Sequence, residues 1–262
     1  MIYLKSDEEI KIMAEGGNIL NEVMEKLLKT VDIGMEMIEL DRLAESEIIK
    51  RGAKPSFKTV PGYRWTICAC VNDIVVHGVP GTYKAKKNDI IGIDLGIYFK
   101  GFHTDCSWTI RVGGYNKKNN HPVDEFLQCG QIALDRALKT VQPDNYIFDI
   151  SRAIQNTVEQ AGYSVVKNLI GHGIGKKLHE EPEIPGFVSK PRKKTTKIVP
   201  GLTVAVEVIY NLGSGEVDYI KEDGWTIKTR DGKISGLFET TVAVTNHGVI
   251  LLTKKYGPSG DN

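Results

Sequence analysis

The sequence predicts an α+β fold of two similar halves, each with two helices followed by antiparallel strands. Helix-like and strand-like patterns occur in the same order twice along the 262 residues. The segment Leu28-Lys29-Thr30-Val31 recurs 110 residues later as Leu138-Lys139-Thr140-Val141, and two candidate helix-ending glycines, Gly52 and Gly162, have the same separation. We therefore expect one domain spanning 1–262, with pseudo-repeat halves at about 1–112 and 122–250. Two halves of this kind predict a central site between their strands.

The first half opens with two helices. Ser6 and Glu9 have the spacing of a capping box, which predicts a helix start. One stripe of that helix is apolar or small: Ile10, Met13, Gly17, Leu20, Met24, Leu27 and Leu28. A second helix is expected over about 37–50, ended by Gly52. Strand-like runs follow at 66–76, 90–99 and 102–111.

Two aspartates lie within the strand-like stretch 90–107. Isoleucine and leucine alternate there with other residues in a period of two, and Lys100-Gly101 is a candidate turn. A two-residue loop would put Asp94 and Asp105 on one face of a hairpin. A loop of one or three residues would put them on opposite faces, and the sequence leaves both open. On one face, the carboxylates would be costly to bury without a cation, and a divalent metal ion is the simplest choice.

The second half repeats the order of the first. A polar loop is expected over 113–121. Helices are expected over 123–139 and 147–160, the latter ended by Gly162. Strand-like segments follow at 164–169, 202–210 and 237–244.

Composition argues against several functional classes. The chain is 41% hydrophobic and 26% charged, and its formal net charge of +1 gives no argument for a nucleic-acid or membrane partner. The start MIYLKSDEE lacks the apolar region of a signal peptide. No run approaches the roughly 18–20 apolar residues of a membrane span. The cysteines form no CxxC pair, which favours reduced thiols in a cytosolic protein: Cys68, Cys70, Cys106 and Cys129.

Two histidines follow the fourth expected helix. His172 lies in the glycine-rich segment GHGIG, where backbone and ligand can approach closely. This segment is not a GxGxxG dinucleotide loop, and His179 does not have the i,i+4 spacing of a helical zinc site. Either histidine alone would be interpreted as an ordinary turn residue.

Two glutamates interrupt apolar strands of the second half. Glu207 and Glu239 lie in runs that should be buried, and glutamate is almost never buried without a partner. With Asp94 and Asp105, each half then has two such acids. The four acids could instead lie at solvated positions on sheet edges. We prefer one shared cation site, because it explains all four acids at once.

Four carboxylates and one or two imidazoles form a hard, oxygen-rich site. Such a site suits Mn²⁺, Fe²⁺ or Co²⁺, or a pair of these ions, better than a thiolate zinc site. Four carboxylates also balance the charge of two divalent ions. Two ions about 3.5–4 Å apart can activate a shared hydroxide and polarise a carbonyl, so hydrolysis is the expected chemistry.

Together, these motifs resemble those of the type I methionine aminopeptidases, which have the pita-bread fold. The resemblance extends from the first helix to Val244, and the motifs are specific when taken jointly and in order. They are His77 in NDIVVHGVP, Asp94 and Asp105 in IDLGIYFKGFHTD, His172 in GHGIG, His179 in LHEEP, Glu207 in AVEV and Glu239 in FETT.

The resemblance implies an enzyme that removes the N-terminal methionine from nascent proteins when the second residue is small. Its cofactors would be two divalent metal ions, such as Co, Mn or Fe. The implied ligands are Asp94, Asp105, His172, Glu207 and Glu239, with Asp105 and Glu239 bridging. A metal-bound hydroxide would attack the scissile carbonyl, and Glu207 would handle its proton.

The resemblance also implies substrate contacts. His179 would hydrogen-bond the substrate peptide and its tetrahedral intermediate, and His77 would orient the scissile amide or leaving group. By position, Tyr63, Cys68 and Trp225 match the pocket for the methionine side chain. Cys68 could equally be a small core residue, and Trp225 could be mere cover.

Some residues depart from the family pattern. Leu178 stands where phenylalanine is common, Leu169 where an aromatic residue or methionine is usual, and Gly186-Phe187 replaces a His/Asn-aromatic pair. These departures leave the tolerance for the second substrate residue open. The basic run 190–194, within the loop 190–197, is expected to be solvated, with ribosome docking as the alternative hypothesis.

Rival functions share the same fold. Xaa-Pro peptidases usually have a large N-terminal domain, whereas here the first helix begins by about residue 7. Type II methionine aminopeptidases have a helical insertion where this chain has a short interval between Glu207 and Glu239. A non-catalytic relative would typically lack ligands, and all five are present. We expect a cytoplasmic monomer that acts on nascent polypeptides and binds neither nucleic acid nor membrane.

Overall fold

The computed structural model describes residues 2–114 and 121–257. Within them, four α-helices occur where the sequence predicts them, in two pairs: α1 Asp7–Thr30 with α2 Met37–Lys50, and α3 Pro122–Thr140 with α4 Ile147–Gln160. The capping box at the start of α1 is present, because Ser6 Oγ accepts from the Glu9 N–H and the Ser6 N–H donates to the Glu9 carboxylate. Gly52 and Gly162 follow α2 and α4 with φ of 75° and 84°. Glycine adopts this left-handed conformation without steric cost, which explains the helix ends.

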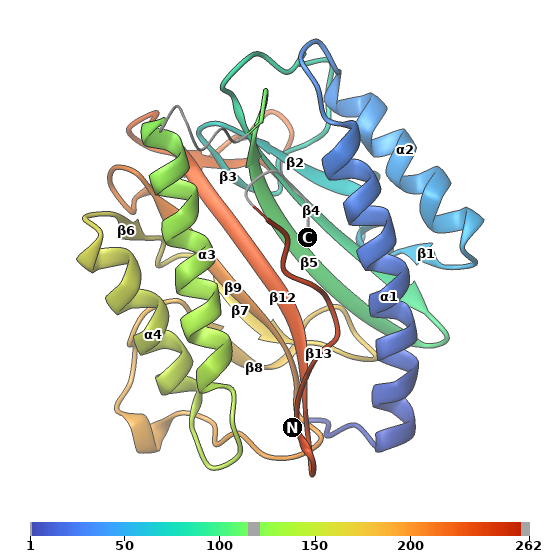
Figure 1. Ribbon diagram of the computed structural model, residues 1–262, viewed down its shortest axis with the longest axis vertical. Coiled ribbons are helices and arrows are strands. Elements are labelled where there is room, and N and C mark those ends of the chain that lie inside the picture. The colour runs from blue at the N-terminus through green and yellow to red at the C-terminus, as the bar shows by residue number, and fades with distance from the viewer. Residues whose placement is uncertain (1, 115–120, 258–262) are drawn as a thin grey trace.

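A ten-stranded antiparallel sheet forms the centre of the molecule (Figure 1). Its main path is β1-β4-β5-β12-β9-β7-β8, while β2, β6 and β13 pair with β4, β9 and β12. The bounds are β1 Lys54–Pro55, β2 Ile67–Val71, β4 Ile90–Phe99, β5 Phe102–Arg111, β6 Ser164–Val165, β7 Ile170–Gly173, β8 Glu180–Pro185, β9 Thr203–Asn211, β12 Ser235–Thr245 and β13 Gly248–Leu251. The two halves of the chain meet where β5 pairs with β12.

A smaller sheet joins the halves a second time. It has the order β10-β11-β3, with β10 Val217–Tyr219, β11 Ile227–Thr229 and β3 Ile74–Val76. Strand β3 comes from the first half and β11 from the second, so this sheet holds the segment before His77 against β11.

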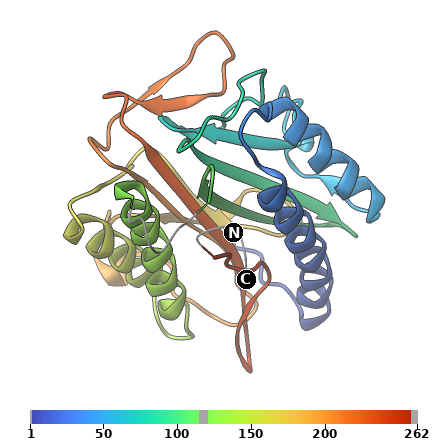
Figure 2. The same cartoon turned by 45° about the horizontal axis from the view of Figure 1, so that its top comes forward.

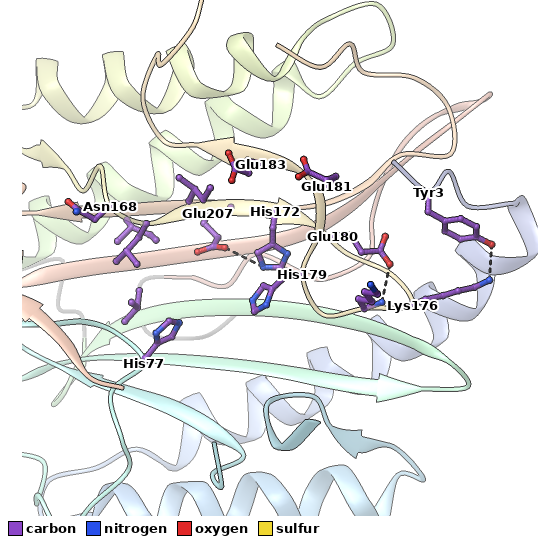
Figure 3. Close-up of a pocket in the computed structure, with 16 residues that line it drawn as sticks. Tyr3, His77, Asn168, His172, Lys176, His179, Glu180, Glu181, Glu183 and Glu207 are labelled. Carbon is purple, nitrogen blue, oxygen red and sulfur yellow. Dashed lines mark hydrogen bonds and ion pairs between the residues drawn. The ribbon is translucent and has the colours of Figure 1, made fainter. Parts of the chain in front are cut away.

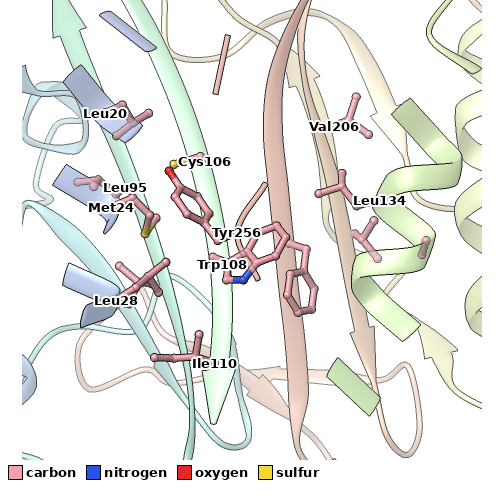
Figure 4. Packing of buried hydrophobic residues seen from close by; sticks show 14 of the residues in the cluster. Leu20, Met24, Leu28, Leu95, Cys106, Trp108, Ile110, Leu134, Val206 and Tyr256 are labelled. Atoms are coloured by element: carbon pink, nitrogen blue, oxygen red, sulfur yellow. The ribbon is translucent and has the colours of Figure 1, made fainter. Parts of the chain in front are cut away.

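The helices cover one face of the large sheet, leaving the other face for the site. Figures 1 and 2 show the two helix pairs side by side over this sheet. Between helices and sheet lies the main core, in which Leu20 and Met24 of α1 face Leu95 of β4 and Trp108 of β5 (Figure 4). The buried aliphatic residues Ile91, Ile93, Leu95 and Ile97 all belong to it. Because side chains alternate along a strand, Asp94 points to the opposite face.

The two-residue hairpin alternative is the one observed. Phe99 pairs with Phe102, which leaves Lys100 and Gly101 as the loop. Both have positive φ, 46° and 96°, as a type I′ turn requires. Asp94 is then opposite Ser107, and Asp105 is opposite Gly96. The two aspartates therefore share a face.

Several strands differ from the sequence prediction. The strand expected over 164–169 is limited to Ser164–Val165, and pairing resumes at β7. Strands β7 and β8 were not predicted as such, because glycines in one and prolines in the other obscure any alternation of apolar residues. Strands β1, β10, β11 and β13, and the short 3₁₀ helices Phe57–Thr59 and Arg192–Lys194, were also not predicted. Most of the polar loop expected over 113–121 lies outside the described residues.

The α+β prediction, with two helix pairs and antiparallel strands, is confirmed. The interval between α2 and β1 equals that between α4 and β6. The interval between α1 and α2 likewise equals that between α3 and α4. The boundaries of the two pseudo-repeat halves, about 1–112 and 122–250, stay a prediction. None of the helices in the described ranges is both long and apolar enough to cross a membrane.

Candidate metal centre and active site

A small cavity of about 140 Å³ lies on the sheet face opposite the helices. All ten site residues singled out from the sequence line it: Tyr63, Cys68, His77, Asp94, Asp105, His172, His179, Glu207, Trp225 and Glu239. Phe57, Val60, Val76 and Leu178 complete the lining. The fold thus brings together side chains from both halves of the chain.

The four acidic side chains come from four neighbouring strands. Asp94 is on β4, Asp105 on β5, Glu239 on β12 and Glu207 on β9. Glu207 and Glu239 face each other directly across the β9–β12 pair. This arrangement concentrates negative charge at the centre of the sheet.

Ser107 lies between two of these carboxyl groups. Its Oγ is 2.8 Å from both Asp94 Oδ1 and Glu239 Oε2. A hydroxyl has only one proton, so Ser107 can donate to only one of these two carboxyl groups. The other carboxyl group must itself be protonated, or its contact with Ser107 must rearrange when a cation binds.

Among the fully buried carboxylate oxygens of the cluster, two have no hydrogen-bond partner in the described residues. They are Asp105 Oδ1 and Glu239 Oε1, both fully buried. Buried polar atoms are almost always satisfied, so these two atoms need an explanation. Ligand atoms of Asp105, His172 and Glu239 lie within 4.8 Å of one another. A cation between them would satisfy both oxygens, so the donor set fits a divalent metal ion.

The acidity of the four carboxyl groups supports the same conclusion. Burial raises the pKa of Asp94 to about 6, against hydrogen bonds from Ser107 and Cys68 that lower it. Burial also raises the pKa values of Asp105, Glu207 and Glu239, and neighbouring carboxylates raise them further. Without a cation the cluster therefore holds protons to a higher pH than free carboxyl groups do, and a divalent ion would replace them.

His172 is oriented as a metal-binding imidazole would be. Its Nδ1 lies 2.9 Å from Gly173 O, so a proton on Nδ1 donates to that carbonyl. This tautomer leaves Nε2 free, 3.5 Å from Glu207 Oε1. Burial lowers the pKa of His172 to about 4, with a further contribution from His179, so the ring is neutral at pH 7.

Two further histidines line the cavity beside this cluster. The His179 ring packs edge-on against His172, with centroids 4.5 Å apart. His77 follows β3 with φ of 55°, an unusual conformation for a residue with a side chain. Burial lowers the pKa values of both rings, and the proximity of His179 lowers that of His77 further. Both can therefore be neutral hydrogen-bond donors at neutral pH.

The inner wall of the cavity is largely apolar. Tyr63 packs edge-on against Trp225 at 5.1 Å between centroids, and its hydroxyl donates to Ile67 O. The same hydroxyl lies 3.2 Å from Cys68 Sγ. Phe57 and Val60 were missed by the sequence reasoning, because they lie on and just after a 3₁₀ helix without a periodic pattern.

The cavity opens into a larger groove of about 820 Å³ (Figure 3). Five residues line both spaces and so mark the junction: Val76, His77, His172, His179 and Glu207. Among the departures from the family pattern, Leu178 lines the cavity and Leu169 the groove. Phe187 packs against the main core instead.

Comparisons with known proteins agree with this geometry. Residues 11–246 match the metallopeptidase family M24. The chain is 40% identical to a methionine aminopeptidase of Clostridium perfringens over 253 residues, covering 97% of this chain and 99% of the relative. It is 39% identical to methionine aminopeptidase 1 of Bacillus subtilis, with 97% and 100% covered.

Solved structures give the same result. The methionine aminopeptidase of Thermotoga maritima superposes with a TM-score of 0.90 at 32% identity, covering 97% of this chain and all of the other. A prolidase of Pyrococcus furiosus superposes with a TM-score of 0.76 at 21% identity, over 97% of this chain and 66% of the other. The prediction of a pita-bread fold is confirmed.

Proposed function

The chain belongs to metallopeptidase family M24, and we propose that it is a metal-dependent methionine aminopeptidase. The observation that carries this proposal is the cavity that unites four buried carboxyl groups, His172 and two further histidines with an apolar wall. Full-length similarity to methionine aminopeptidases supports removal of an N-terminal methionine.

We propose that Asp94, Asp105, His172, Glu207 and Glu239 hold two divalent ions, with Asp105 and Glu239 bridging. The unpartnered oxygens of Asp105 and Glu239 support their roles as ligands. Carboxylate-rich sites with one imidazole suit Mn, Fe or Co. When bound, such ions polarise a carbonyl and provide a nucleophile at neutral pH.

Glu207 is proposed to move the proton of the reaction. It lines both the cavity and the groove, where the scissile bond of a bound peptide would lie. At this position its carboxylate would accept a proton during attack and release it to the leaving amine.

The two neutral histidines are proposed to act on the peptide itself. His179 would donate a hydrogen bond to the scissile carbonyl oxygen and stabilise the charge that develops there. His77 would orient the leaving amide from the other side of the junction. Both rings lie at the junction of cavity and groove, which supports these positions.

The shape of the site supports a preference for methionine. The smaller cavity, with Tyr63, Cys68 and Trp225, would take the unbranched methionine side chain, and the groove would take the following residues. The second residue would have to pass between the histidines at the junction. A large side chain there would meet steric cost, so we propose a preference for a small one.

The decisive assay compares peptide substrates. Metal-free protein supplied with Mn²⁺ or Co²⁺ should release methionine from Met-Ala-Ser, and a chelator should stop it. Xaa-Pro peptides are the control, and they should be cleaved far more slowly. Absence of activity toward Met-Ala-Ser with every divalent ion tried, or faster cleavage of Xaa-Pro, would overturn the proposal.

We also propose a cytoplasmic monomer that acts on nascent chains and has a solvated basic loop, with ribosome docking by this loop as the alternative hypothesis. Arg192 pairs with Asp149 at the start of α4, whereas Lys190, Lys193 and Lys194 are exposed. If the loop docks on the ribosome, replacing these three lysines by glutamine should weaken co-sedimentation with ribosomes. Unchanged co-sedimentation would remove this partner from the proposal.

A further inference from the structure

Lys5 is a buried lysine that the proposed reaction does not use. Its side chain is 1% exposed, and Nζ lies 2.6 Å from Glu180 Oε2. Nζ also donates to Tyr3 O at 3.0 Å, and the Lys5 N–H donates to Gly201 O at 2.7 Å. Burial lowers the pKa of Lys5, and Glu180 opposes this effect. The segment before α1 is thus attached to a residue 175 positions away.

Glu180 uses both carboxylate oxygens to close the turn between β7 and β8. One oxygen accepts from Lys5, and the other accepts from the Lys177 N–H at 3.0 Å. Its backbone pairs with Gly173 at the end of β7. Glu180 therefore holds the C-terminal end of the segment 174–180, while hydrogen bonds between Ile174 and Thr203 hold its N-terminal end.

The last glycine of the GHGIG segment makes room for this contact. A Cβ at Gly175 would lie 2.3 Å from Lys5 Cε and 2.7 Å from Lys5 Nζ. No other amino acid can occupy this position unless the lysine moves. The Gly175 carbonyl also accepts from the His103 N–H at 2.7 Å, which fixes the turn to β5. Gly175 and Lys5 are thus packed as a unit.

This turn carries His179, the residue directly before Glu180 (Figure 3). In the described part of the chain, the His179 ring makes no hydrogen bond, and its defined packing contact is the edge-on one with His172. The position of the ring therefore depends on the backbone of the turn. Small shifts of a catalytic group are costly to turnover.

We propose that Lys5 and Glu180 are positioning residues, and that their buried ion pair fixes the 174–180 turn so that His179 meets the substrate carbonyl. This inference rests on the proposed function of His179. Buried ion pairs seldom add net stability compared with apolar packing. A role in geometry therefore accounts better than stability for a charged pair at this position.

The test uses Lys5→Met, Glu180→Gln and the double variant in the full-length, metal-loaded protein. Each single variant leaves one buried group without its partner and should unfold more easily, whereas the double variant should recover much of the stability. In all three, amides of 174–180 should exchange about tenfold faster or more. With Met-Ala-Ser, kcat should fall about ten- to a hundredfold, with little change in KM or metal content. Lys254→Met, which removes an exposed ion pair with Glu25, is the matched control and should change none of these.

The outcomes separate the alternatives. Faster exchange in the turn with low kcat in the double variant, despite recovered stability, supports positioning. If kcat in the double variant recovers together with stability, the ion pair contributes only to stability, and the proposal is overturned. Unchanged exchange in the turn would overturn it independently of any activity. If the parent protein fails to cleave Met-Ala-Ser, the proposed function fails, and the exchange measurement still decides whether the pair holds the turn.

Discussion

Glu207 on β9 and Glu239 on β12 lie directly opposite each other in the centre of the sheet. Like charges at paired positions destabilise a sheet, and both carboxyl groups are withdrawn from water. Their pKa values are raised, first by burial and then by neighbouring carboxylates. Strands β9 and β12 therefore pair at a place that is unfavourable until a cation binds.

Metal binding should stabilise the protein increasingly as pH rises. Acids with a raised pKa in the folded state bind more protons folded than unfolded, so the metal-free protein loses stability as pH rises above about 4. For Asp94 this loss is complete above its folded pKa of about 6. A bound ion removes the penalty by pairing with the ionised groups. The increase in unfolding temperature on adding Mn²⁺ should thus grow from about pH 5 to about pH 8. An increase that shrinks over this range would contradict the assignment.

Replacing Glu207 should remove both a ligand and a proton acceptor. Glu207→Ala should abolish turnover of Met-Ala-Ser and lower metal content. Glu207→Gln keeps the shape but cannot accept the proton, so kcat should fall about a hundredfold or more even at saturating metal. Steady-state kinetics with parallel metal analysis checks both. Substantial activity of metal-loaded Glu207→Gln would assign the proton transfer elsewhere.

The sequence predicted the elements whose signals are local. The bounds of α2 follow from apolar periodicity and Gly52, and the β4–β5 hairpin from alternation around Lys100-Gly101. The four acids were visible because carboxylates interrupt apolar strands. Whether Asp94 and Asp105 share a face depended on the length of the turn between β4 and β5. The sequence left this length open, and the structure shows a two-residue turn.

What the sequence missed depends on contacts between distant segments. Strand β7 forms because it lies between β8 and β9, not because of its own composition. Phe57 joins the pocket only because the 3₁₀ helix folds over β4. Lys5 and Glu180 are separated by most of the chain, so neither signals the other in sequence.

His179 should be separable from the metal site. His179→Ala removes a hydrogen-bond donor that is not expected to be a ligand, so kcat should fall about a hundred- to a thousandfold with metal content unchanged. His179→Gln, which keeps an N–H donor, should retain more activity than the alanine variant. Measured kcat and metal stoichiometry give the comparison. Metal loss as large as in Glu207→Ala would show that His179 acts as a ligand.

Gly96 should control the metal site through its lack of a side chain. It lies opposite Asp105 on the β4–β5 hairpin, and a Cβ there would be 3.2 Å from Asp105 Oδ1, the unpartnered oxygen. The same Cβ would lie 2.9 Å from Ser56 Cβ, so the methyl group has little room to move away. Gly96→Ala should therefore displace the carboxylate and weaken Mn²⁺ binding about tenfold or more, besides costing about 1–3 kcal/mol of stability.

Gly92→Ala is the matched control for this substitution. Gly92 lies on the same strand and face, and its Cβ would be crowded by Thr109 and Cys70 at 3.1 and 3.3 Å. Because neither neighbour is a proposed ligand, Gly92→Ala should cost similar stability but leave the affinity for Mn²⁺ near that of the parent. Calorimetric titration of metal-free protein measures the affinities, and thermal unfolding measures the stabilities. Equal loss of affinity in both variants would attribute the effect to general strain in β4 and would remove the argument that Gly96 keeps space for the Asp105 carboxylate.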